Sequence, residues 1–248
     1  KMKYPKSIAI TYQTSFTQLH SEAKQLYQVF SWFAPDPIPR SLLDLIENPV
    51  DVSACLRDIL HFRLAQFTAD GKSFTIHRLN QEITRQQQED AMPEGLVIAL
   101  KWLDNQLPLD LDDVRTWPVA VPLIPHAVAS AKSGIACHLL SPSGELLNQA
   151  ALFLTARADY ENAESLCRKA LDSAEETERA GGHFHATCLS NLAEVLRATG
   201  CLSEAEIVAR RAIDIWDSLE AGDESQIASS KNNLALILLA LDRFTEAE

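Results

Sequence analysis

Apolar residues recur at helical spacing along most of the chain and predict a mainly α-helical protein. In the first third they predict helices over 8–19, 21–33, 40–46 and 51–62. Pro35, Pro37 and Pro39 end the second of these helices, because proline has no backbone N–H and restricts the residue before it.

The segments 61–66 and 74–77 instead have an extended pattern, and Asp70-Gly71 between them is a hairpin turn signal. A polar, glutamine-rich helix is predicted to follow over 76–88. Helices followed by a small β-hairpin form the element order of a winged helix. The pattern therefore predicts a winged-helix domain over residues 1–90.

Residues 91–145 predict a helical connector, a degenerate hairpin that caps the next domain. Its first helix covers 96–107. Prolines in the following part predict a helix over 112–132 with breaks, and 134–144 is predicted to be a connection.

From residue 146 onwards the sequence repeats itself with a step of 42 residues. Asn191-Leu192-Ala193 recurs at 233–235, and Glu204-Ala205-Glu206 recurs at 246–248. A constant step of this length is typical of stacked helical hairpins, which cannot bury their apolar faces singly. We therefore predict three repeats over 146–248, the last one truncated, with the apolar residues of its first helix partly uncovered (Leu234, Ile237, Leu238 and Leu241).

The spacing of small and apolar residues in these units resembles the tetratricopeptide repeat, and the 42-residue length resembles the repeats of kinesin light chains. The resemblance implies an α-solenoid whose first helices line a groove for a protein or peptide partner. The groove positions it implies are Asn148, Gln149, Ser190, Asn191, Glu194, Arg197, Asn232 and Asn233. An asparagine amide can both donate to and accept from a peptide backbone, or it can form a ladder between neighbouring helices. Both interpretations remain open at this point.

Composition and charge exclude several classes of function. A net charge of −12 gives no positive field for nucleic acid or anionic lipid, so neither is an expected partner. Five scattered cysteines without a CxxC motif fit reduced thiols in a cytoplasmic protein. No stretch resembles a signal peptide or a membrane span.

For three motifs, the residues support a structural interpretation better than a chemical one. Gly71-Lys72-Ser73 ends like a phosphate-binding loop, but Gln66 stands where that loop needs glycine, so we interpret the segment as a turn. A DNA-binding third helix would use Arg57, His61 and Arg63, which Asp51 and Asp58 offset. His183, His185 and Cys188 have the spacing of a zinc motif, but His185 aligns with Ile227 in the next repeat, so we predict a packing position and no metal site.

The front of the chain carries three characteristic segments, 15–19, 32–39 and above all 74–79, Phe-Thr-Ile-His-Arg-Leu. They resemble the winged-helix region of NB-ARC (STAND) signalling ATPases, which include the NOD-like receptors of innate and antiviral defence. In that family the histidine after the hairpin contacts the β-phosphate of ADP, and His77 falls on it. Arg78 stands where the plant proteins have aspartate, so the role of that aspartate in their nucleotide-dependent switching is not carried over to this chain. The alternative for His77 is a ring that packs and donates to a carbonyl.

Together these resemblances imply the regulatory, sensor part of a longer signal-transduction ATPase, with its own nucleotide-binding domain upstream and oligomerisation on activation. The winged helix would sense ADP or ATP with Mg, and the repeats would bind an activating ligand or protein. The fragment itself is not expected to be an enzyme or to hold a cofactor, because no phosphate loop and no catalytic set is evident in residues 1–248. The rival interpretation is a passive adaptor whose repeats bind peptide segments.

Overall fold

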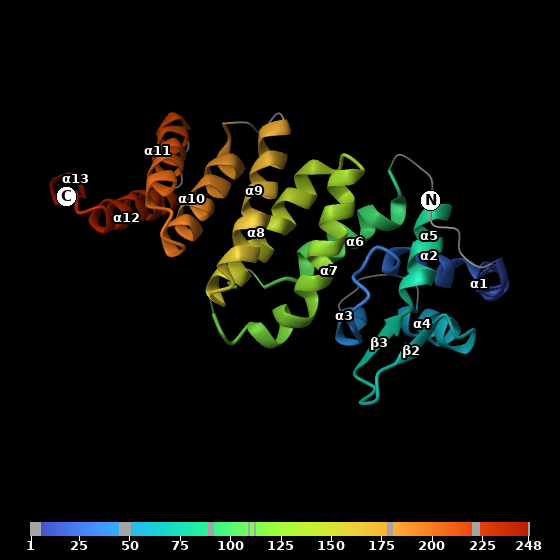
Figure 1. The fold of residues 1–248 in the computed structure, drawn as a ribbon. Helices are drawn as coiled ribbons and strands as arrows, with labels where there is room; N and C mark the ends of the chain where they lie inside the picture. Colours follow the sequence, from blue (N-terminus) through green and yellow to red (C-terminus); the bar gives the residue numbers. More distant parts are fainter. Residues whose placement is uncertain are drawn as a thin grey trace. The chain divides into compact units, whose positions relative to one another are not determined.

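A computed structural model describes residues 6–44, 51–88, 92–108, 110–111, 113–177, 181–219 and 224–247. The chain divides into two compact units (Figure 1). Unit 1 comprises Lys1–Leu109 with Arg115–Cys137, and unit 2 comprises Asp110–Val114 with His138–Glu248. Most described residues are helical, as the apolar periodicity predicts.

Unit 1 carries the helices expected from the sequence, with bounds shifted by a few residues. In chain order it contains α1 Lys6–Gln18, α2 Ser21–Phe30, β1 Ile38–Pro39, α3 Ser41–Asp44, α4 Val52–His61, β2 Ala65–Phe67, β3 Ser73–Ile76, α5 Arg78–Gln87, α6 Glu94–Gln106 and α7 Trp117–Ala136. Asp51 caps α4, since its side chain accepts a hydrogen bond from the Ala54 N–H at 2.9 Å.

The described part of unit 1 has a small antiparallel sheet with strand order β1-β3-β2. β2 and β3 pair as the turn signal predicts, with Gln66 opposite Thr75 and Gly71 at φ 66° in the turn. β1 is an additional strand that the sequence pattern did not indicate, since two residues are too few to show alternation.

Aromatic rings from α2 and β3 form the centre of unit 1. Phe30 packs edge-on against Phe33 and Phe74, with ring centroids 5.6 and 5.2 Å apart. The buried amide of Gln81 on α5 donates to the carbonyls of Phe30 and Phe33. These carbonyls lie at and beyond the end of α2, where helical partners are missing, so the glutamine supplies the donors that a buried helix end needs.

The predicted breaks in 112–132 are wrong for α7, which runs without interruption through Pro122 and Pro125. By length and composition alone α7 could cross a membrane, contrary to the sequence expectation. One face of it is nevertheless buried, including Ala120, Ala127 and Ala131. A polar group on α7 binds unit 1 as well, since Ser130 Oγ donates to the Trp32 carbonyl at 3.1 Å. α7 therefore packs one face within the fold, while Val119 and Val121 are exposed.

Unit 2 consists of consecutive helix pairs, coloured from yellow-green to red in Figure 1. The helices are α8 Leu140–Ala156, α9 Tyr160–Glu176, α10 His183–Ala198, α11 Leu202–Ser218, α12 Glu224–Ala240 and α13 Phe244–Ala247. The predicted connection over 134–144 is wrong, because α7 extends to Ala136 and α8 begins at Leu140. Pro142 lies in the first turn of α8, where a missing N–H costs nothing.

The turn within each helix pair repeats with the 42-residue step of the sequence. Ala158, Gly200 and Asp242 all have a positive φ, of 59°, 81° and 60°. The next residue in each case donates its N–H to a carbonyl five positions back, as Asp159 does to Leu154 at 2.9 Å. This hydrogen bond closes the helix end in a Schellman motif. Glycine is free of strain at this position and alanine is not.

Exchanging residue types at two of these turns should shift stability in opposite directions. Gly200→Ala should lower the free energy of unfolding of unit 2 by about 0.5–1 kcal/mol, and Ala158→Gly should raise it by a similar amount. A Cβ at Gly200 would meet no atom within 4 Å, so the effect is purely conformational. Urea denaturation followed by circular dichroism measures both. If both substitutions changed the free energy of unfolding in the same direction, the assignment of a positive φ to both turn residues would be contradicted.

Ion pairs join the second helix of each repeat to the next repeat. Arg168 binds Glu164 on its own helix and Glu204 of the following repeat, at 2.8 and 2.9 Å. Arg210 repeats the arrangement with Glu206 and Glu246, at 2.9 and 3.6 Å. The recurring Glu-Ala-Glu sequence therefore supplies one carboxylate within a helix and one between repeats.

The apolar interior of unit 2 includes several small residues of α11. Ala205, Ala209 and Ala212 are buried, and so is Trp216, which packs on Ala186 and Leu189 of α10. On α12 the sequence expectation was wrong in part: Ile237 and Leu238 are fully covered. The exposed leucines of that helix are instead Leu236 and Leu239.

Candidate functional site

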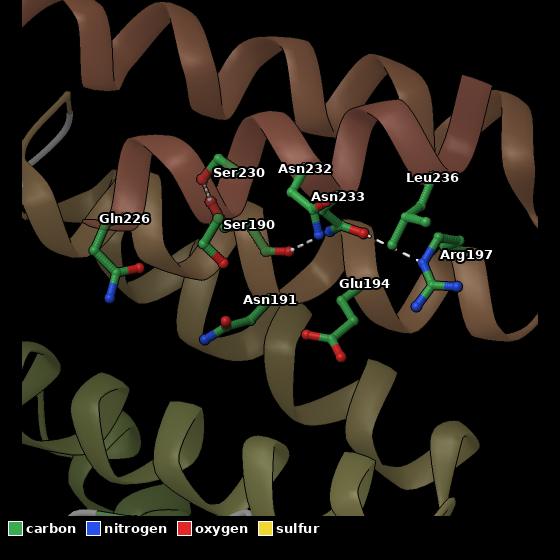
Figure 2. A pocket seen from close by; sticks show the side chains of 10 residues that line it. Ser190, Asn191, Glu194, Arg197, Gln226, Ser230, Asn232, Asn233 and Leu236 are labelled. Carbon is green, nitrogen blue, oxygen red and sulfur yellow. Dashed lines mark hydrogen bonds between the residues drawn. The ribbon is translucent and has the colours of Figure 1, made fainter. Parts of the chain in front are cut away.

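A polar pocket of about 190 Å³ lies between α10 and α12 in unit 2 (Figure 2). Its lining comprises Ser190, Asn191, Glu194, Arg197, Gln226, Ser229, Ser230, Asn232, Asn233 and Leu236. We refer to it as the α10–α12 pocket. Both walls are first helices of adjacent repeats, so the step of the repeat brings equivalent positions face to face.

Hydrogen bonds between the helices hold the inner wall of the pocket in place. Asn233 donates from Nδ2 to the Ser190 carbonyl at 3.4 Å and accepts at Oδ1 from Arg197 Nε at 3.3 Å (Figure 2). Ser190 Oγ lies 2.8 Å from Ser230 Oγ, and the Trp216 indole N–H lies 3.4 Å from the same Ser190 oxygen. Both the Nδ2 and the Oδ1 of Asn233 are thus hydrogen-bonded within the protein.

An asparagine bond with the same offset, but to a side-chain oxygen instead of a backbone carbonyl, occurs one repeat earlier. Asn191 donates from Nδ2 to Asn148 Oδ1 at 2.9 Å, and the two residues are 43 positions apart, as are Asn233 and Ser190. An asparagine ladder between helices is therefore present, which was one of the two interpretations of these residues. It does not exclude binding at the amides that face the pocket.

Six of the eight groove residues inferred from the sequence line this one pocket: Ser190, Asn191, Glu194, Arg197, Asn232 and Asn233. The other two are not part of its lining. Asn148 is buried, with 6% of its surface exposed, and serves as the acceptor for Asn191. Gln149 is half-buried on α8.

Four further lining residues were missed by the sequence analysis: Gln226, Ser229, Ser230 and Leu236. The signal that could have found three of them is helical spacing. Gln226, Ser229 and Ser230 precede Asn233 by seven, four and three positions, so they occupy the same face of α12. The exposed side chains of Ser229 and Asn232 give this wall hydroxyl and amide groups that face solvent.

The pocket belongs to a segment with a strongly negative net charge. Residues 138–248 contain 19 acidic and 9 basic residues, a net charge of −10 out of the chain's −12. Within the pocket, Glu194 and Arg197 lie one turn apart on α10, and the Arg197 guanidinium is tied to Asn233. The surroundings thus favour a partner with basic groups.

The residues of the candidate zinc motif do not converge. His185 is buried, and its Nδ1 accepts the Gly181 N–H at 2.8 Å, while the His183 ring contacts the indole of Trp216. Burial, together with the nearby Arg211 guanidinium, holds the pKa of His185 below its usual value. Among the described residues no three His, Cys, Asp or Glu side chains are placed to hold a metal ion.

In unit 1, His77 is the N-cap of α5 and is exposed. Its Nδ1 accepts a hydrogen bond from the Leu79 N–H at 3.2 Å. In the neutral ring the proton then resides on Nε2, which is a donor on the solvent side. The ring is therefore an acceptor toward the helix, unlike the alternative in which it packs and donates to a carbonyl.

Comparison with known proteins adds a family for part of unit 2. Residues 143–218 match the family model of the tetratricopeptide repeat. These residues are tetratricopeptide repeats. The match covers α8 to α11 and includes the α10 wall of the pocket. Repeats of this kind bind protein partners in general. No curated protein matches the chain in sequence.

Solved structures with related repeats are only distantly similar. BtubC (BKLC) from P. vanneervenii is 17% identical with a TM-score of 0.49, the match covering 68% of this chain and 75% of that one. TPR-like repeats of a Podosopora anserina protein described as a kinesin light chain are 16% identical, with a TM-score of 0.36 and coverage of 67% and 86%. A STAND protein with a tetratricopeptide repeat sensor from Pyrococcus horikoshii is 14% identical, with a TM-score of 0.32. That match covers 100% of this chain and 46% of the other.

Proposed function

We propose that unit 2 is a protein-binding module whose α10–α12 pocket holds an extended segment of a partner protein. The observation that supports this proposal is the convergence of six sequence-inferred groove residues on one polar pocket. No enzymatic role is proposed for the pocket, which offers hydroxyl, amide and one carboxylate group without a nucleophile and base pair.

The pocket groups divide into a supporting set and a binding set. Asn233, Ser190 and Ser230 bind one another or their neighbours and fix the spacing of the two helices. Asn232 and Ser229 are exposed on the α12 wall, where an amide and a hydroxyl can pair with the N–H and C=O groups of an extended peptide. The net negative charge of unit 2 favours a segment that carries Lys or Arg.

Removing the binding set should weaken peptide binding without disturbing the fold. Peptides selected on the full chain from a library of random linear peptides provide the probe. We expect the double variant Ser229→Ala/Asn232→Ala to lose about 30-fold in affinity, since each of the two hydrogen bonds contributes about 1 kcal/mol. Fluorescence anisotropy with labelled peptides measures the change, and the selected peptides should be enriched in basic residues.

The matched control is Asn162→Ala, which removes an exposed asparagine on α9 outside the pocket. It should leave the affinity unchanged. Equal affinities of the double variant and the parent chain, or a library without binders, would sink the proposal.

A finer proposal follows from the NB-ARC resemblance of residues 15–19, 32–39 and 74–79. In it, unit 1 acts as a winged helix, and His77 donates from Nε2 to a phosphate oxygen of ADP held by a nucleotide-binding domain of the same protein. The exposed Nε2 side of His77 at the N-cap of α5 supports this role. Binding of a partner to the repeats would then favour the active state of a signalling ATPase, with ADP or ATP and Mg in the whole protein.

The rival proposal, a passive adaptor, keeps the peptide pocket but assigns unit 1 a structural role. A GxxxxGK[ST] sequence in the same protein before residue 1 would favour the proposal of a nucleotide-controlled signalling ATPase. A sequence without such a loop would favour the adaptor.

A further inference from the structure

Three side chains of unit 1 form a continuous chain of contacts at the junction of α2 and α4. His20 is the N-cap of α2, and its Nδ1 lies 2.6 Å from Asp58 Oδ2. The other ring nitrogen, Nε2, lies 3.7 Å from the Sγ of Cys55. Cys55 and Asp58 are one turn apart on α4, so the packing of α4 against α2 brings all three together.

The imidazole of His20 lies between the carboxylate of Asp58 and the thiol of Cys55, and this order determines the chemical role of each group. Asp58 also accepts the backbone N–H of His20 at 3.3 Å, which fixes the carboxylate beside the imidazole. In the neutral ring, Nδ1–H donates a hydrogen bond to the carboxylate, which leaves Nε2 as an acceptor for the thiol. A thiol, a base and a carboxylate that orients the base are the parts of an activated nucleophile. The His20 side chain is 47% exposed, so the ring can exchange its proton with water.

A mainly apolar pocket of about 70 Å³ adjoins the thiol. Its apolar lining comes from α2, α4 and α6 and comprises Leu26, Val29, Val52, Cys55, Ile98 and Trp102, while Glu22 and Gln25 of α2 add polar groups. Cys55 itself is only 1% exposed, so bulk water has little access to it, and this pocket is the space that borders it. A space of this size holds a ligand of a few heavy atoms.

The surroundings keep the thiol protonated at rest. Burial raises the pKa of Cys55, and the carboxylates of Glu22, Asp51 and Asp58 raise it further. A protonated thiol is a weak nucleophile, so its reaction requires a base that removes the proton as the sulfur attacks. His20 is placed to be that base. Cys167 and Cys188 are also buried, and no histidine contact accompanies either of them in the part of the chain that the structure describes.

We propose that Cys55 is a covalent modification site for small α,β-unsaturated carbonyl compounds. The sulfur forms a bond to the β-carbon while His20 Nε2 takes the thiol proton. The electron pair of the C=C double bond moves to the α-carbon, which then takes a proton from the imidazolium. The product is a thioether, and the addition needs no oxidant, leaving group or metal.

Alkylation of the native full chain by acrylamide tests the proposal, with peptide mass spectrometry giving the rate at each cysteine. Cys55 should react at least about tenfold faster than Cys167 and Cys188, and His20→Asn should lower its rate at least about tenfold. Ile98→Trp, which fills the pocket, should also slow Cys55. The exposed Cys201 should keep its rate in every variant and serves as the internal reference.

Loss of fold cannot imitate the expected result, because unfolding of unit 1 would expose Cys55 and raise its rate. Asp58→Asn provides a second variant of nearly unchanged size and should slow Cys55 as well. A native Cys55 that reacts no faster than Cys167 and Cys188 would overturn the proposal. A rate that is unchanged or raised in both His20→Asn and Asp58→Asn would overturn it too.

Discussion

Replacing Trp216 with alanine should lower the free energy of unfolding of unit 2 by about 3–5 kcal/mol. The indole is 2% exposed and packs against Ala186, Leu189 and Ala212, so its removal leaves a cavity between α10 and α11. The variant also removes the indole N–H from Ser190 Oγ, which supports the inner wall of the α10–α12 pocket. Urea denaturation monitored by circular dichroism measures the loss.

The control for this experiment lies on the same helix. Ile207 is 68% exposed, and Ile207→Ala should change the free energy of unfolding by no more than about 0.5 kcal/mol. Trp216→Phe should have an intermediate effect, because an apolar ring still fills most of the space. A Trp216→Ala variant as stable as Ile207→Ala would show that the packing of α10 on α11 has been assigned incorrectly.

In the full-length protein, His77→Ala should weaken ADP binding by about 10- to 100-fold. A hydrogen bond to a charged group contributes about 1.5–3 kcal/mol, and the proposed bond runs from Nε2 to phosphate. The bound nucleotide should shift from ADP toward ATP, and basal signalling activity should rise. Chromatography of the nucleotide released from purified protein measures the shift.

Two further variants separate phosphate contact from helix capping. His77→Asn keeps a good N-cap residue for α5 but has a shorter side chain, so it should lose ADP as His77→Ala does while the stability of unit 1 is kept. His61→Ala removes another exposed histidine of unit 1, outside any N-cap position, and should leave nucleotide content unchanged. Unchanged ADP content in both His77 variants would count for the passive adaptor.

The fold of unit 2 could be predicted well because its signals are periodic. The 42-residue step predicted the helix pairs, and positive φ values recur with the same step at Ala158, Gly200 and Asp242. The continuous helix α7 was not predictable in the same way. Pro122 and Pro125 argue locally for a break, and packing of the helix against the rest of unit 1 outweighs that local preference.

The residues of the candidate sites were likewise only partly predictable from the sequence. Asn191 and Asn233 stood out because they repeat, yet their hydrogen bonds to Asn148 and Ser190 could not be assigned from one sequence. The contact of His20 with Cys55 was invisible there, because 35 residues separate them and no motif spans the interval. Repetition in the sequence identifies candidate groove positions. Three-dimensional packing determines which of their side chains bind a neighbouring helix and which remain exposed for a partner.

Two kinds of inter-repeat bond in unit 2 recur at a fixed offset. Each asparagine bond spans 43 residues, and Arg168 and Arg210 each reach a glutamate 36 residues ahead. Because these bonds recur at the same offsets, a whole 42-residue block can be duplicated or removed in frame while the asparagine and arginine positions keep their spacing. The array can therefore change length by unit steps during evolution, lengthening or shortening its binding surface without a new interface having to arise.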